Sequence, residues 1–177
     1  MNNKLILGTV QFGLDYGITN KTGKIFEYEL DNIFNFCNKN MILYFDTAQD
    51  YGTSEDILAE YKKIYPEMKI ITKATFKNKD IIQTIDKSIN KFNSIDYFML
   101  HSFSDYNSTI MSYLIEYKNK LKIGKIGVSV YTVEEAIICI NDTNIDLIQI
   151  PFNYLDLQWF NETFQNLIKQ RQIEIHA

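Results

Sequence analysis

The sequence lacks the features that mark membrane proteins, secreted proteins and nucleic-acid-binding proteins. No apolar run approaches the roughly 18 residues that a membrane-spanning helix needs, and residues 1–10 lack the long apolar run and cleavage site of a secretory signal. The net charge of −4 is not offset by any stripe of basic residues, which argues against a nucleic-acid or anionic-membrane partner. We therefore expect a soluble cytoplasmic protein.

Cysteine is scarce, and its two positions do not suggest a disulfide. Cys37 and Cys139 each fall inside an apolar pattern of helical period. Buried thiols in a reducing compartment fit this placement better than a disulfide does. We expect both cysteines to be buried and free.

Linker sequence is also missing. No segment rich in proline, glycine and serine divides the chain, and no segment is of low complexity. A length of 177 residues suits one domain with one hydrophobic core. We expect residues 1–177 to form a single domain.

What the chain does contain is an alternation of short β-rich runs with longer segments of helical period. The expected strands are residues 4–9, 42–45, 69–72, 97–100, 125–129, 146–150 and 172–176. Helical patterns separate them, and the last of these covers residues 157–168. Thr53 with Asp56, and Thr132 with Glu135, would open two of the helices through capping boxes.

Such alternation predicts a parallel sheet of βαβ units, which can be an open doubly wound sheet or a barrel. The first strand is not followed by the G-x-G-x-x-G turn of a dinucleotide-binding open sheet. Polar residues instead follow several successive strands, as they do at the mouth of a barrel. The sequence favours the barrel.

Four polar residues stand at or near the ends of successive strands: Asp46, Tyr51, Lys73 and His101. Each has an ordinary structural explanation. Asp46 could cap a helix, Tyr51 is one of 12 tyrosines, Lys73 could be a solvated surface lysine, and His101 could be a hydrogen-bonded core histidine. Because neighbouring strand ends converge on one mouth, the set together predicts a site more specifically than any member does.

Six motifs in order resemble those of the aldo-keto reductases. They are LILGTVQFG (5–13), FDTAQDYGTSE (45–55), ITKAT (71–75), YFMLHS (97–102), KIGVSVY (125–131) and QIPFNYLD (149–156). The resemblance covers essentially the whole chain. It implies a parallel (β/α)8 TIM-barrel type of fold, here incomplete and ending at about the seventh strand. It also implies NAD(P)H-dependent reduction of an aldehyde, ketone or sugar carbonyl, or the reverse reaction.

The chemistry of carbonyl reduction gives each of the four residues a role. Negative charge develops on the carbonyl oxygen and must be protonated or held by donors, and Tyr51 would be the proton donor. The Lys73 ammonium would favour ionisation of the tyrosine and so lower its pKa. Asp46 would pair with Lys73, and His101 would hydrogen-bond the carbonyl oxygen and orient it.

By the same resemblance, Ser129 and Gln149 match positions that hold the nicotinamide carboxamide, and Thr9 matches a residue near the nicotinamide ribose. Val130 stands where the family commonly has asparagine, so one polar contact is lost. Thr9 could equally be a plain strand-end hydroxyl. The cofactor would be NADP or NAD, with NADP preferred only by family habit, and we expect no metal site.

The expected barrel ends at its seventh strand, without the loops that hold the cofactor's phosphates in the family. We therefore expect weak cofactor binding by this chain. The first and seventh strands would be unpaired edges, which would favour association with a second copy or marginal stability. Two alternatives to a reductase stay open: a non-catalytic remnant or interaction subunit, and a barrel aldolase that uses Lys73 as a Schiff-base nucleophile.

Overall fold

Seven parallel strands form one sheet, and their order in the sheet is their order in the chain. The computed structural model describes residues 5–177. The strands are β1 (Ile6–Gly8), β2 (Tyr44–Asp46), β3 (Lys69–Ala74), β4 (Ile95–Leu100), β5 (Ile123–Ser129), β6 (Leu147–Gln149) and β7 (Glu174–His176). All seven expected strands are present, each with at least one shifted end; Lys4, the first residue expected in β1, lies outside the described residues.

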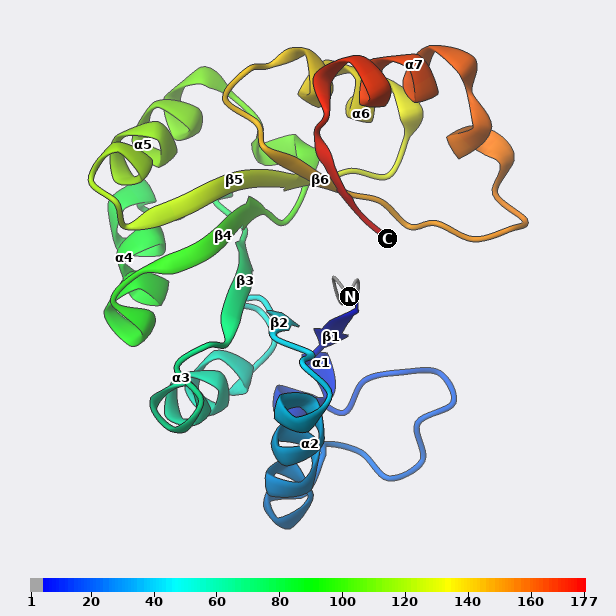
Figure 1. Cartoon of the computed structure of the whole chain (residues 1–177). Coiled ribbons are helices and arrows are strands. Elements are labelled where there is room, and N and C mark those ends of the chain that lie inside the picture. The colour runs from blue at the N-terminus through cyan, green and yellow to red at the C-terminus, as the bar shows by residue number, and fades with distance from the viewer. Residues whose placement is uncertain (1–4) are drawn as a thin grey trace.

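The helices lie on the outer side of the sheet, which curls into an incomplete barrel that is open between β1 and β7 (Figure 1). They are α1 (Val10–Gly13), α2 (Glu27–Lys39), α3 (Ser54–Ile64), α4 (Ile81–Phe92), α5 (Ser108–Asn119), α6 (Val133–Asn141) and α7 (Glu162–Arg171), with short 3-10 turns at Phe103–Asp105 and Leu157–Phe160. The fold is thus the incomplete parallel barrel that the sequence predicts.

Alternation along the strands separates an outer core from an inner face. The outer core joins strand residues such as Phe98 and Ile126 to helix residues such as Leu58 and Leu114, all of them fully buried. The inner face has a small apolar cluster of strand residues only: Ile71, Tyr97, Met99 and Leu147, with Ile6 and Tyr44 partly buried beside them.

This alternation directs three polar side chains into the barrel. Asp46, Lys73 and Gln149 each lie two residues beyond a member of the inner cluster, so they share its face and lie nearer the carboxyl ends of their strands. The sequence period that places apolar residues inside the barrel also places these three at its mouth.

Two cysteines and one cap are as predicted. Cys37 and Cys139 are free and buried. Thr132 accepts a hydrogen bond from the backbone N–H of Glu135 at 3.2 Å, although the Glu135 carboxylate accepts from the N–H of Tyr131 and not from that of Thr132.

Two local predictions were wrong. Thr53 makes no side-chain cap at α3; its hydroxyl accepts a hydrogen bond from Lys24 Nζ at 2.7 Å. Residues 157–168 do not form one helix, because Asn161 interrupts them with non-helical backbone and caps α7 through its side chain.

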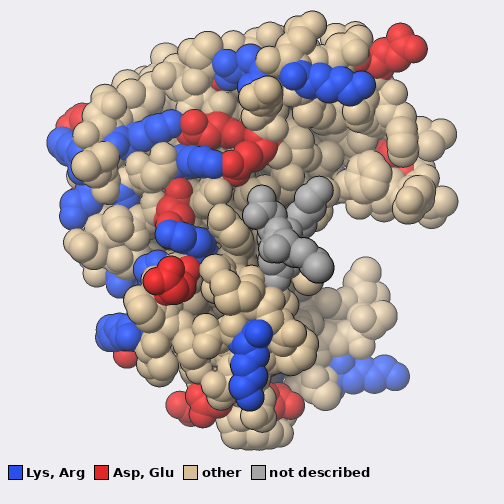
Figure 2. All heavy atoms as spheres, in the orientation of Figure 1, with Lys and Arg blue, Asp and Glu red and all other residues tan. Residues whose placement is uncertain are grey.

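The surface shown in Figure 2 carries acidic and basic side chains side by side. No helix within residues 5–177 is both long and apolar enough to cross a membrane.

Candidate active site

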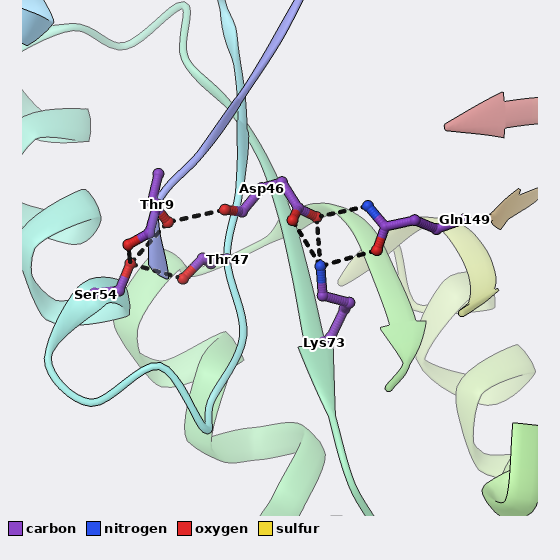
Figure 3. A network of polar contacts seen from close by, with 6 residues as sticks. All are labelled: Thr9, Asp46, Thr47, Ser54, Lys73 and Gln149. Atoms are coloured by element: carbon purple, nitrogen blue, oxygen red, sulfur yellow. Dashed lines mark hydrogen bonds and ion pairs between the residues drawn. The ribbon is translucent and has the colours of Figure 1, made fainter. Parts of the chain in front are cut away.

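An ion pair from β2 and β3 lies at the centre of the barrel mouth. Lys73 Nζ donates to both carboxylate oxygens of Asp46, at 2.7 and 2.6 Å, and to Gln149 Oε1 at 3.0 Å. Gln149 Nε2 lies 3.4 Å from Asp46 Oδ1, which closes the triangle (Figure 3). The Lys73 side chain is only 3% exposed. A buried ammonium needs such partners, because an isolated charge in this place would be very costly.

Hydroxyl groups fix the strand end that carries Asp46. Thr9 donates from its hydroxyl to the Asp46 backbone carbonyl at 2.8 Å and lies 2.8 Å from Ser54 Oγ. Thr47 donates to the same Ser54 oxygen at 2.9 Å. Figure 3 shows this network on one side of Asp46 and Lys73 with Gln149 on the other. Thr9 is fully buried. Its hydroxyl contacts the Asp46 backbone and the Ser54 hydroxyl, and not the Lys73 ammonium.

Two glycines allow the loop that carries Tyr51 to lie close against α1. A Cβ on Gly13 would stand 1.7 Å from the backbone oxygen of Tyr51, and a Cβ on Gly52 would stand 2.4 Å from that of Gly13. Gly52 also has a φ of +57°, a conformation that side chains disfavour. Backbone contact between α1 and this loop therefore fixes where Tyr51 enters the mouth.

Tyr51 lies beside the ion pair, with Lys73 Nζ 5.5 Å from its ring centroid. Its pKa is raised to about 12, first because the phenol is buried and then because the Asp46 carboxylate is close, with Tyr16 and Tyr131 contributing. The expected net lowering of this pKa is therefore not found. The physical reason is that Asp46 neutralises the ammonium and itself opposes a second negative charge. Tyr51 is therefore a protonated phenol at neutral pH.

His101 completes the group from the end of β4. Its ring meets the Tyr51 ring edge-on, with the centroids 5.8 Å apart. Burial lowers the pKa of His101, and the Lys73 charge adds to this, while Asp50 acts in the opposite direction. The imidazole is therefore neutral near pH 7, and the structure brings Asp46, Tyr51, Lys73 and His101 together as predicted.

The residues expected to hold the nicotinamide lie on adjacent strands. Ser129 pairs in register with Gln149 between β5 and β6, and Ser129 is 9% exposed. Gln149 already uses both ends of its carboxamide on Lys73 and Asp46. Val130 is fully buried in the outer core, so its side chain is a packing group.

Sequence reasoning missed Asp50 and His176. Asp50 Oδ2 lies 3.6 Å from His101 Nδ1; its position directly before Tyr51 was the available signal. His176 pairs in register with Gln149 on β7, its pKa is lowered first by burial, and its Nδ1 is buried without a hydrogen-bond partner among the described residues. Both histidines thus stand near this mouth.

A large cavity among residues 5–177 lies elsewhere, on the outer side of the barrel. It measures about 1010 Å³ and is lined by the loop before α2 and by parts of α2, α3 and α4, for example Phe26, Tyr61 and Lys91. None of the four predicted catalytic residues lines it.

A family model of the aldo/keto reductase family matches residues 4–175 of the sequence. The chain belongs to this family. Carbonyl reduction with a nicotinamide cofactor is the general chemistry of aldo-keto reductases, so an oxidoreductase is the class that this membership supports. A comparison with curated proteins found no match.

Solved aldo-keto reductases share the fold. PA4992 from Pseudomonas aeruginosa is 21% identical, with a TM-score of 0.80 over 96% of this chain and 70% of that one. AKR11C1 from Bacillus halodurans, in a holo form, is 20% identical, with a TM-score of 0.76 over 97% of this chain and 60% of that one. Tm1743, solved with the inhibitor epalrestat, is 19% identical, with a TM-score of 0.72 over 96% and 65%. The chain therefore spans about 60 to 70% of the length of these structures.

Proposed function

We propose that this protein reduces the carbonyl group of an aldehyde, ketone or sugar with NADPH or NADH, and that Tyr51 donates the proton. The observation that carries the proposal is the grouping of a protonated phenol, a neutral imidazole and a buried Lys73–Asp46 pair at one mouth. Groups of these kinds can stabilise or protonate the negative charge that develops on a carbonyl oxygen during reduction.

In the proposed reaction, Tyr51 transfers its hydroxyl proton to the carbonyl oxygen as the carbonyl carbon is reduced. A pKa of about 12 keeps this proton in place at neutral pH, which suits reduction better than oxidation. The tyrosinate left behind stands near the Lys73 ammonium and regains a proton from water. Asp46 and Gln149 hold Lys73 in position throughout.

The nicotinamide cofactor, when bound, would supply the hydride. Ser129 is the residue best placed to hold its carboxamide, because no hydrogen bond from another described side chain engages the Ser129 hydroxyl. Gln149 would have to release Asp46 or Lys73 to take part. The described residues of the mouth provide no free cation for the cofactor's phosphates, since Lys73 is paired. We therefore propose that residues 5–177 bind the cofactor weakly and at its nicotinamide end, with NADP the preferred form by family habit.

Lys73 also bears on the alternative of a Schiff-base aldolase. A nucleophilic lysine must present an unprotonated amine with a free lone pair. Lys73 Nζ instead donates to three oxygen atoms at 3.0 Å or less, which favours a structural and electrostatic role. A non-catalytic remnant with the same residues remains the main alternative.

The two buried, free cysteines support our further proposal that the protein works in the reducing cytoplasm.

Turnover of NADPH with a panel of aldehydes tests the proposal against the remnant. We expect nicotinamide fluorescence to report weak, saturable binding, and absorbance to report aldehyde-dependent oxidation that Tyr51→Phe abolishes. The matched control Tyr28→Phe, at a tyrosine on α2 that is 70% exposed, should keep most of the activity. No oxidation with any aldehyde, and no binding at millimolar NADPH, would favour the remnant.

A further inference from the structure

A buried chain of hydrogen bonds on the outer side of the barrel holds both ends of the segment that carries Tyr51. Gln49, two residues before Tyr51, donates from Nε2 to the Ser88 hydroxyl at 2.7 Å. The same amide group donates to the Thr84 backbone carbonyl at 2.6 Å. The Ser88 hydroxyl donates in turn to Glu55 Oε1 at 2.6 Å, and Glu55 follows Tyr51 by four residues. Ser88 on α4 therefore joins the residues on either side of Tyr51.

The Glu55 carboxylate also joins this segment to the strand that carries Lys73. Thr72 on β3 donates to Glu55 Oε1 at 2.7 Å, and Thr72 directly precedes Lys73. Because side chains alternate along a strand, Thr72 points to the outer side while Lys73 points into the barrel. The Gln49 backbone N–H donates to the Lys73 carbonyl at 2.8 Å. Both ends of the segment are thus fixed against the strand from which Lys73 reaches the mouth.

Burial gives this network its rigidity. Ser88 and Thr72 are fully buried, and Glu55 is only 2% exposed. Hydrogen bonds in such surroundings meet little competition from water and hold the groups that they join. Glu55 Oε2 has no hydrogen-bond partner among the described residues and lies 3.5 Å from Lys91 Nζ. The Ser88 and Thr72 hydroxyls therefore provide all the hydrogen bonds that residues 5–177 give this carboxylate.

We propose that Ser88 and Glu55 are positioning residues for Tyr51. They hold its ring beside the Lys73 ammonium, which lies 5.5 Å from the ring centroid. Backbone contact with α1 fixes the loop from one side, and this network fixes it from the other. A reacting group displaced by about 1 Å can lose about a hundredfold in rate, so a support outside the mouth affects the reaction. The inference rests on the proposed function and extends it to side chains that touch neither substrate nor cofactor.

Carbon NMR of the tyrosine rings tests the positioning without any need for turnover. The chain has 12 tyrosines, and Tyr51→Phe identifies the Tyr51 signal. We expect Ser88→Ala to shift or broaden this signal, because the loop loses the contact that joins its two ends. Gln49→Ala removes one end of the chain and should change the signal in the same way, which decides the question if Ser88→Ala does not fold.

The matched control is Tyr117→Phe. It removes the 2.7 Å hydrogen bond from the Tyr117 hydroxyl to Asp86, which joins α4 to α5 and not to the Tyr51 loop. The Tyr51 signal should therefore stay unchanged in this variant. A Tyr51 signal that both Ser88→Ala and Gln49→Ala leave unchanged, or that Tyr117→Phe changes equally, would overturn the proposal.

Kinetics with NADPH and glyceraldehyde separate positioning from a loss of folded protein. We expect Ser88→Ala to lower kcat about tenfold with little change in KM, and to raise the solvent deuterium isotope effect on kcat, because proton transfer from Tyr51 becomes slower. A smaller folded fraction would lower kcat and leave the isotope effect unchanged, and that result would contradict the inference. If the unmodified chain reduces no aldehyde, the proposed function fails, while the carbon spectra still decide whether Ser88 positions Tyr51.

Discussion

Lys73 is the residue on which most contacts of the site converge. The layer of the barrel interior below Lys73 is apolar. The Lys73 ammonium donates its hydrogen bonds to Asp46 and Gln149. Removing one member of such a pair leaves the other charge without a partner in a place that water scarcely reaches.

We predict that Lys73→Met destabilises the fold by about 3 kcal/mol, because Asp46 is left as an uncompensated, largely buried carboxylate. Adding Asp46→Asn to that variant should recover part of the loss. Urea unfolding of the two single variants and the double variant measures this. Additive effects of the two substitutions would show that the pair is not coupled.

At the residue scale, the sequence was sufficient to select four residues that the structure brings together, and insufficient to find their partners. Asp46, Tyr51, Lys73 and His101 could be found because each follows the apolar run of its strand. Asp50 contacts His101 across 51 positions of the chain, and His176 comes beside Gln149 only through strand pairing. Contacts between loops of different strands leave no periodic signal. For the same reason the sequence could not show that burial and the Asp46 carboxylate raise the pKa of Tyr51.

At the scale of single elements, the sequence pattern at a helix start does not decide which partner the capping side chain takes. Asn107 accepts a hydrogen bond from the Ile110 N–H at the start of α5, at 3.0 Å. Thr53 has the same opportunity at α3, but its hydroxyl contacts Lys24 instead. A capping-box pattern gives the residue types, while the tertiary neighbours decide which partner the side chain takes.

Asn107→Ala should therefore cost about 1 kcal/mol of stability through loss of the cap. Thr53→Ala should cost less than about 0.5 kcal/mol, because it removes only an exposed contact. Chemical denaturation of both variants checks the difference. Equal losses would mean that the Thr53 hydroxyl caps α3 in solution.

Residues 157–168 show how apolar spacing can mislead. Leu157, Phe160 and Phe164 fit one helical face, yet Leu157 and Phe160 are exposed and only Phe164 is buried. Asn161 accepts from the Phe164 N–H at 3.1 Å and starts α7 there. The Asn161 cap therefore starts a separate helix, although the apolar spacing predicts one continuous helix.

At the scale of the whole molecule, the sheet formed by residues 5–177 has two unpaired edges. Within these residues, β1 pairs only with β2, and β7 pairs only with β6. Parallel edges with free backbone groups attract further strands, so we predict that the purified chain self-associates at micromolar concentration or melts without a sharp transition. Sedimentation velocity and calorimetry measure both. A clean monomer with a cooperative melt would contradict this prediction.

Stability should also depend on pH through the two histidines. The pKa values of His101 and His176 are both lowered from 6.5 by burial, so the unfolded chain binds protons more readily than the folded one just below pH 6.5. The free energy of unfolding should therefore fall as the pH falls through that value and level off below the folded pKa values. Urea unfolding at about pH 7.5 and about pH 5.5 measures the slope. His176→Gln should flatten it, and an unchanged slope would exclude His176 as a contributor.

Transfer of deuterium from NADPH labelled at the transferable position, detected by mass spectrometry in the alcohol formed from glyceraldehyde, tests the proposed function most directly. We predict one deuterium per alcohol molecule with the unmodified chain and no alcohol with Tyr51→Phe. Alcohol formed without deuterium, or equal transfer by both proteins, would contradict the assignment of Tyr51 as the proton donor of a carbonyl reductase.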